Sequence, residues 1–250
     1  ARPRKFQVLV LAALFGVALG IALCITVENL DQTIRTQDDV QTRLGLPLLG
    51  AVPRSSLFRG DSGDEYYQLV NDAKSLTGES FKDIRTMLGF ASAGRELRSL
   101  LVTSAVQGEG KTFLAINLAL AFAQLGEKVL LIEGDLRRPN LHKRFGLSRE
   151  NGLSRFLAHG EDLSELSALI QPVIVPNLNV LPCGPIPPNP SELLSLPRLK
   201  ALMGWAKEKF DHVIVDGTPV LPVSDAQLWG RQVDGGLFVV QFGGVRAAVV

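Results

Sequence analysis

The sequence predicts a doubly wound α/β domain with a parallel sheet, preceded by one transmembrane helix. Three observations support this prediction. A long uncharged apolar run occupies residues 8–27. Short runs rich in Val, Leu and Ile recur from residue 99 onward, and segments with helical periodicity separate them. Polar, ligand-binding residue types follow several of these runs directly, and doubly wound sheets bind ligands at the carboxyl ends of their strands.

The composition limits the classes of protein to be considered. The chain has 250 residues, enough for one large or two small domains. Its 26 Lys and Arg nearly balance its 25 Asp and Glu, so no global charge favours nucleic acid, and no nucleic-acid partner is expected. Hydrophobic residues make up 46% of the chain, which is high for a soluble domain and indicates contact with lipid. The two cysteines, Cys24 and Cys183, are far apart, so neither a disulfide framework nor a cysteine metal site is expected.

The apolar run at residues 8–27 accounts for much of the hydrophobic excess. As a helix it would span about 30 Å, the thickness of the hydrocarbon core of a bilayer. A cleavable signal peptide is the main alternative, but the run is too long and no small-x-small cleavage site follows it. Basic residues near its ends favour a cytoplasmic N-terminus, whereas a downstream site for cytoplasmic nucleotide requires the opposite orientation.

The remainder of the chain divides into a linker and a folded domain. Residues 28–75 are polar and rich in turns, which predicts a juxtamembrane linker, and residues 76–250 have the α/β pattern. Strands are expected at 99–105, 129–132, 180–181, 212–215 and 236–242, and helices at 79–90 and 113–125.

A phosphate-binding loop follows the first expected strand. The segment Ala105-Val-Gln-Gly-Glu-Gly-Lys-Thr112 lies between a strand and a helix, the context that this motif requires. Its glycines let successive main-chain N–H groups face a phosphate, and the helix N-terminus adds partial positive charge. Lys111 would reach the terminal phosphates and the Thr112 hydroxyl would join the Mg²⁺ shell. The sequence therefore predicts a P-loop NTPase-like fold, with these nucleotide-binding residues: Gln107, Gly108, Glu109, Gly110, Lys111, Thr112 and Phe113.

Acidic residues stand at the ends of two other apolar runs. Glu133 and Asp135 follow one run, and Asp216 ends another. A carboxylate at the end of a buried strand is costly unless it is paired, so a metal ion or a proton-transfer role explains the three acids. Capping of the following helices is the structural alternative.

These motifs resemble those of a known family. Residues 105–112, 130–137 and 213–216 are similar to the Walker A, Walker A′ and Walker B motifs of the bacterial tyrosine kinases (BY-kinases), which form the cytoplasmic part of polysaccharide co-polymerases. The resemblance covers nearly the whole chain. Its other matching segments are residues 3–5, which look like the end of a periplasmic domain, the juxtamembrane segment 44–50, the ExxRxxR-like helix 79–85, and the loops 185–194 and 219–226.

The resemblance implies ATP and Mg²⁺ as cofactors and assigns roles to matching positions. Lys111 would bind phosphate, and Thr112, Asp135 and Asp216 would hold Mg²⁺. Glu133, where the family usually has Asp, would activate the tyrosine hydroxyl as general base. The catalytic set implied by the resemblance is therefore Lys111, Glu133, Asp135 and Asp216.

The resemblance also implies partners and a location. Glu79, Lys82 and Arg85 would join copies of the chain into a ring, with Lys82 where the family usually has Arg. The protein would be anchored in the bacterial inner membrane, in contact with lipid, with its catalytic domain in the cytoplasm. Its other partners would be the polysaccharide polymerisation and export machinery and an opposing phosphotyrosine phosphatase.

The family's acceptor tyrosines cluster in a C-terminal tail. This chain stops at Val250, a few residues after the last expected strand, so the kinase domain is expected to be truncated and its tail and final helix to lie beyond. The only tyrosines, Tyr66 and Tyr67, are expected to be exposed aromatic residues of the linker.

Three functions remain in competition. The first is a membrane-anchored, ATP-dependent protein-tyrosine autokinase that regulates exopolysaccharide or capsule polymerisation and export. The second is a membrane-associated ATPase of the MinD/ParA type, which the sequence disfavours because Val106 replaces the signature lysine of that group. The third is a nucleotide-binding scaffold with weak catalysis, which the unusual Glu133 keeps open.

Overall fold

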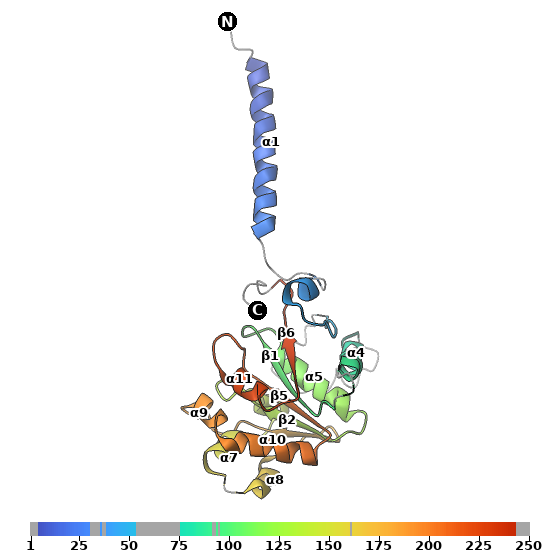
Figure 1. Ribbon diagram of the computed structural model, residues 1–250, viewed down its shortest axis with the longest axis vertical. Helices are drawn as coiled ribbons and strands as arrows, with labels where there is room; N and C mark the ends of the chain where they lie inside the picture. Colours follow the sequence, from blue (N-terminus) through green and yellow to red (C-terminus); the bar gives the residue numbers. More distant parts are fainter. Residues whose placement is uncertain are drawn as a thin grey trace.

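A six-stranded sheet forms the centre of the protein, as a computed structural model shows for residues 5–30, 36, 39–53, 76–91, 94, 96–160 and 162–243. The strand order is β3-β4-β2-β5-β1-β6. Figure 1 labels the four neighbouring strands β2, β5, β1 and β6. All pairings are parallel except that of the short β3 with β4. The strands are β1 Ser99–Ser104, β2 Val129–Glu133, β3 Gln171–Pro172, β4 Leu178–Leu181, β5 His212–Asp216 and β6 Gly235–Val239. The predicted α/β fold with a parallel sheet is confirmed.

Helices cover both faces of this sheet. Helices α4 and α5 pack on one face, and α7, α9, α10 and α11 pack on the other. The helices of the domain are α4 Leu76–Ala91, α5 Lys111–Ala123, α6 Leu141–Phe145, α7 Leu153–His159, α8 Leu166–Leu169, α9 Pro190–Leu194, α10 Pro197–Lys209 and α11 Asp225–Gly230, with a 3-10 turn at Leu163–Glu165. The structure is thus a three-layer sandwich with a hydrophobic core on each side of the sheet.

The apolar strand sequences follow from this arrangement. In β2, Val129 and Leu131 enter the core shared with α5, whereas Leu130 and Ile132 enter the opposite core. Successive side chains of a strand point to opposite faces, so a strand covered on both sides is apolar throughout. The continuous apolar runs noted in the sequence are therefore central strands, and their carboxyl ends lie along one edge of the sheet.

The N-terminal helix α1, Lys5–Leu30, stands clear of this domain (Figure 1). Its segment Gln7–Thr26 has a mean hydropathy of 2.9 and is exposed along its whole length. By length and composition it can cross a membrane. The predicted helix is confirmed, and its insertion in a bilayer stays a prediction.

Part of the predicted linker packs on the domain. A short π-helix, Val40–Leu44, ends at Gly45 in the left-handed conformation, with φ 65°. Beyond it, Leu49 and Val52 pack against the core that contains α4. Gly50 lies so close to α4 that a Cβ at this position would be 2.7 Å from Cγ1 of Ile84. Tyr66 and Tyr67, which were expected to be exposed aromatic residues of the linker, lie outside the described residues.

Candidate functional site

The phosphate-binding loop connects β1 to α5 at the carboxyl edge of the sheet. Gly108 and Gly110 have φ values of 91° and 96°, a conformation that favours glycine. Gly110 is the residue before the first turn of α5, whose free N–H groups and positive dipole end make a site for an anion. The loop therefore combines two left-handed glycines with a helix N-terminus, which are features of an anion-binding site.

Glu109 braces this loop from within. Its side chain is buried, and its Oε2 accepts a hydrogen bond from the Val106 N–H at 2.9 Å. Its Oε1 accepts one from the Gln241 N–H, just beyond β6, at 3.3 Å. Glu109 was predicted among the nucleotide-binding residues, and in the structure its carboxylate holds the loop in shape and ties it to the sheet.

Lys111 is a buried cation among carboxylates. Only 8% of its surface is exposed, and this burial lowers the pKa of its ammonium group. The charges of Asp216, Asp135 and Glu109 act in the opposite direction and favour the charged form. The sequence predicted that Lys111, Asp135 and Asp216 share one site, and the structure brings them together.

Asp216 ends β5 beside β2, in register with Glu133. Its burial raises the pKa of its carboxyl group to about 7, although a hydrogen bond with Thr112 and the charge of Lys111 oppose this shift. Its Oδ1 has no hydrogen-bond partner within the described part of the chain, and neither does the buried Oγ1 of Thr218 nearby in sequence. A buried oxygen without a partner is suited to a hydrated cation.

The residues present therefore fit a Mg²⁺ ion. Mg²⁺ prefers oxygen ligands and is usually bound through one or two carboxylates together with phosphate oxygens. Thr112, Asp135 and Asp216 provide a hydroxyl and two carboxylates beside the phosphate-binding loop, and their role as metal ligands stays a prediction.

The raised pKa of Asp216 leads to a prediction about stability. The pKa of Asp216 in the folded protein lies above its ordinary value of 3.8. In the metal-free protein its contribution to the free energy of unfolding is therefore greatest below pH 4, and it is lost as the pH rises through about 7. The loss should reach about 4 kcal/mol. We expect the free energy of unfolding of the wild type, minus that of Asp216→Asn, to fall between pH 4 and 7.5 in EDTA. A difference that stays constant with pH would contradict this account.

Glu133 is placed differently from the other acids. Only 1% of its surface is exposed, and both of its oxygens are occupied. Oε1 accepts a hydrogen bond from the Leu141 N–H at the start of α6, and Oε2 accepts one from the Cys183 N–H at 2.8 Å. His142 Nδ1 lies 3.5 Å from Oε1. In this conformation the carboxylate joins the start of α6 to the segment after β4, a contact that the family resemblance does not imply.

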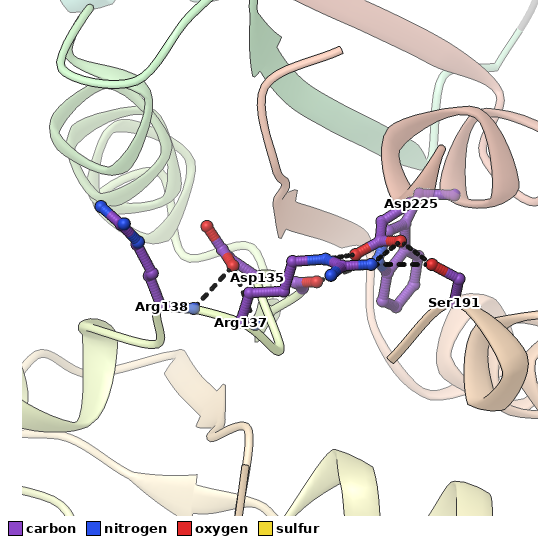
Figure 2. Close-up of polar contacts among 7 residues, drawn as sticks. Asp135, Arg137, Arg138, Ser191 and Asp225 are labelled. Atoms are coloured by element: carbon purple, nitrogen blue, oxygen red, sulfur yellow. Dashed lines mark hydrogen bonds and ion pairs between the residues drawn. The ribbon is translucent and has the colours of Figure 1, made fainter. Parts of the chain in front are cut away.

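Asp135 lies in a tight turn between β2 and α6. Its Oδ1 accepts hydrogen bonds from the N–H groups of Arg137 and Arg138, at 3.0 and 2.9 Å. Figure 2 shows the two arginine side chains leaving this turn in opposite directions. Arg138 Nη1 donates to Oε1 of Gln107 in the phosphate-binding loop, whereas Arg137 contacts Asp225. The turn therefore connects the phosphate-binding loop with the segments that follow other strands.

The sequence reasoning missed Ser191, Asp225 and Trp229, which support this turn. Ser191 and Asp225 fall in the segments 185–194 and 219–226, which in the sequence stand out only as matches to family loops, and in the structure they belong to α9 and α11. The available signal was weak: Asp225 is an acid in the segment that connects β5 to the next helix, nine residues after the end of the strand.

Two further sets of predicted residues make contacts within the domain. The Phe113 ring packs against Phe81, with centroids 5.7 Å apart, so only its main chain is available to a nucleotide. On α4, Lys82 pairs with Glu79 at 2.7 Å, and Arg85 Nη1 donates to the carbonyl oxygen of Ala121 at the end of α5. The three residues implied in ring formation thus make contacts within their own chain.

The fold and site define a nucleotide-binding α/β protein with a P-loop, and a family model described as an AAA domain matches residues 100–227. The chain is 44% identical over 174 residues to tyrosine-protein kinase YwqD of Bacillus subtilis, which covers 70% of this chain and 72% of that protein. It is 33% identical over 258 residues to tyrosine-protein kinase etk of Escherichia coli K12, covering 97% of this chain and 35% of that protein.

Solved structures agree with these relatives. The kinase domain of Escherichia coli tyrosine kinase ETK matches with a TM-score of 0.74 and 35% identity over 82% of each chain. The BceF tyrosine kinase domain matches with a TM-score of 0.73 and 31% identity, over 87% of this chain and 90% of that one. The chain belongs to the bacterial tyrosine-protein kinases, which confirms the predicted family. It spans about a third of the length of the larger relatives, such as etk.

Proposed function

We propose that this chain is a membrane-anchored, ATP-dependent protein-tyrosine autokinase that regulates the polymerisation and export of an exopolysaccharide or capsule. One observation carries the proposal: Lys111 is buried at the start of α5 and is surrounded by the carboxylates of Asp135 and Asp216. Relatives named as tyrosine-protein kinases support the reaction, and one of them is named for a cps region in Klebsiella pneumoniae.

The site suits phosphoryl transfer because this reaction depends mainly on positioning and on stabilisation of charge. The N–H groups of the phosphate-binding loop and the Lys111 ammonium group would hold the phosphates of ATP. Thr112, Asp135 and Asp216 would hold Mg²⁺, which when bound neutralises charge on the phosphate oxygens. Together these groups would hold the γ-phosphate where a tyrosine hydroxyl of a neighbouring copy can attack it.

Glu133 is not needed as a proton acceptor in this scheme. In a loose transition state the tyrosine oxygen bonds to phosphorus late, so the hydroxyl would keep its proton until then and pass it to an oxygen of the transferred phosphoryl group as ADP leaves. The two main-chain N–H groups that bind Glu133 favour a structural role, in which it keeps the start of α6 and the segment after β4 in place.

The proposal extends to assembly and partners. The exposed side of α4, which includes Glu79, would contribute to a ring of copies, and α1 would lie in the lipid of the inner membrane with the domain in the cytoplasm. The export machinery and a phosphotyrosine phosphatase would be the protein partners, as the family resemblance implies.

A phosphotransfer assay tests the proposal. The full chain in detergent, with Mg²⁺ and labelled ATP, is expected to form phosphotyrosine on an added copolymer of Glu and Tyr. Because Tyr66 and Tyr67 are the only tyrosines, the double variant Tyr66→Phe/Tyr67→Phe removes labelling of the chain itself and keeps labelling of the copolymer. Release of phosphate without any phosphotyrosine would reject the kinase and favour a membrane-associated ATPase of the MinD/ParA type.

A further inference from the structure

Helix α11 holds both ends of the turn that carries Asp135. Trp229 Nε1 donates a hydrogen bond to the Gly134 carbonyl oxygen at 3.2 Å, and Asp225 binds the side chain of Arg137. Asp225 and Trp229 are four residues apart, so they lie on the same side of the helix, and both are fully buried. Residues of α11 therefore bind this segment on both sides of Asp135, at Gly134 and at Arg137.

The Arg137 guanidinium group joins three segments of the chain. Its Nε lies 2.7 Å from Asp225 Oδ2 and its Nη2 lies 3.2 Å from Oδ1, so the pair is bidentate. Nη2 also donates to Ser191 Oγ at 2.8 Å, and this hydroxyl donates to Asp225 Oδ1 (Figure 2). These residues belong to the segments that leave β2, β4 and β5, three neighbouring strands.

The main-chain N–H groups of Arg137 and Arg138 both bind Asp135 Oδ1, and Arg137 is the one of the two whose side chain is tied to α11. The Arg137 N–H binds Asp135 Oδ1, so a displacement of Arg137 would turn the carboxylate. There is little room for adjustment on the other side of Asp135, because a Cβ at Gly134 would lie 2.6 Å from Cγ1 of Val215 and 3.1 Å from Trp229 Nε1.

We propose that Arg137, Asp225 and Ser191 are positioning residues that direct Oδ2 of Asp135 toward the Mg²⁺ ion that binds with the nucleotide. The inference rests on the proposed function, since Asp135 is a metal ligand only in that scheme. The planar guanidinium group matters because it binds both Asp225 oxygens and Ser191 at once, which a lysine ammonium group cannot do with the same geometry.

Titration calorimetry of Mg²⁺ binding to the full chain with ADP already present tests this proposal. We expect Arg137→Lys to raise the dissociation constant for Mg²⁺ about tenfold, as is typical when a group that orients a metal ligand is lost. Binding of ADP without metal should change less than about twofold, because the phosphate-binding loop is untouched. Arg198→Lys is the matched control: Arg198 donates to the carbonyl oxygens of Leu157 and Ala158 and should leave Mg²⁺ binding unchanged.

Unchanged Mg²⁺ affinity in a folded Arg137→Lys protein would overturn the proposal and leave only a structural ion pair. If that variant does not fold, Ser191→Ala keeps the Arg137–Asp225 pair, and a twofold to threefold weaker affinity supports the proposal whereas an unchanged one rejects it. Failure of the wild type itself to bind Mg²⁺ with ADP would instead reject the proposed function, so the two failures are distinguishable.

Discussion

Replacement of Lys111 by methionine is expected to reduce phosphotyrosine formation by about 10³-fold. Methionine has a similar length and is apolar, so it fills the buried position without providing a charge. The positive group that would meet the phosphates is then lost, and the carboxylates of Asp135 and Asp216 would repel the nucleotide. Transfer of labelled phosphate to a tyrosine copolymer measures the effect.

A matched control separates this effect from a general loss of charge. Lys200 lies exposed on α10, which packs on the face of the sheet opposite α5, so Lys200→Met should keep wild-type activity. Thermal unfolding of both variants should show that each is folded. Persistent phosphotyrosine in a folded Lys111→Met protein would reject the assigned site.

Replacement of Glu133 by leucine is expected to lower the free energy of unfolding by about 2–5 kcal/mol. Leucine cannot accept the hydrogen bonds of the Leu141 and Cys183 N–H groups, and both would stay buried without a partner. Glu133→Gln keeps one acceptor oxygen and should lose about half as much. Urea denaturation of the two variants measures this difference, and equal stability of leucine variant and wild type would contradict the assigned contacts.

The same position separates a structural role from general-base catalysis. We expect Glu133→Gln, compared at equal amounts of folded protein, to keep phosphotyrosine formation within about fivefold of the wild type, whereas loss of a general base would cost about 10²–10⁴-fold. Glu133→Asp restores the residue usual in the family, but its shorter side chain should not reach both N–H groups. A many-fold gain of activity in Glu133→Asp would instead favour the third candidate function, in which the wild-type chain is a nucleotide-binding scaffold with weak catalysis.

Much of the fold could be predicted because its signals are local. Central strands such as β2 are apolar on both faces, and the phosphate-binding loop lies between a strand and a helix within one continuous segment. The convergence of Asp135 and Asp216 also follows from the sequence, because carboxyl ends of neighbouring parallel strands share one edge.

The contacts that support the site could not be predicted in the same way. Arg137 and Asp225 are 88 residues apart, and Arg137 and Ser191 are 54 apart, so no periodicity relates them. The role of Glu133 depends on where two distant N–H groups lie, which the sequence of β2 does not contain. The inward direction of Arg85 likewise depends on how α4 packs against α5.

The central claim is that the phosphate-binding loop and the carboxylates at the strand ends form a single Mg²⁺–nucleotide site. A crystal structure of the full chain with Mg²⁺ and a non-hydrolysable ATP analogue tests this claim most directly. We predict the γ-phosphate beside Lys111 and the metal ion bound, directly or through water, by Thr112, Asp135 and Asp216, with Glu133 still bound to its two N–H groups. A metal ion held by Glu133, or a nucleotide bound away from Lys111, would contradict the account.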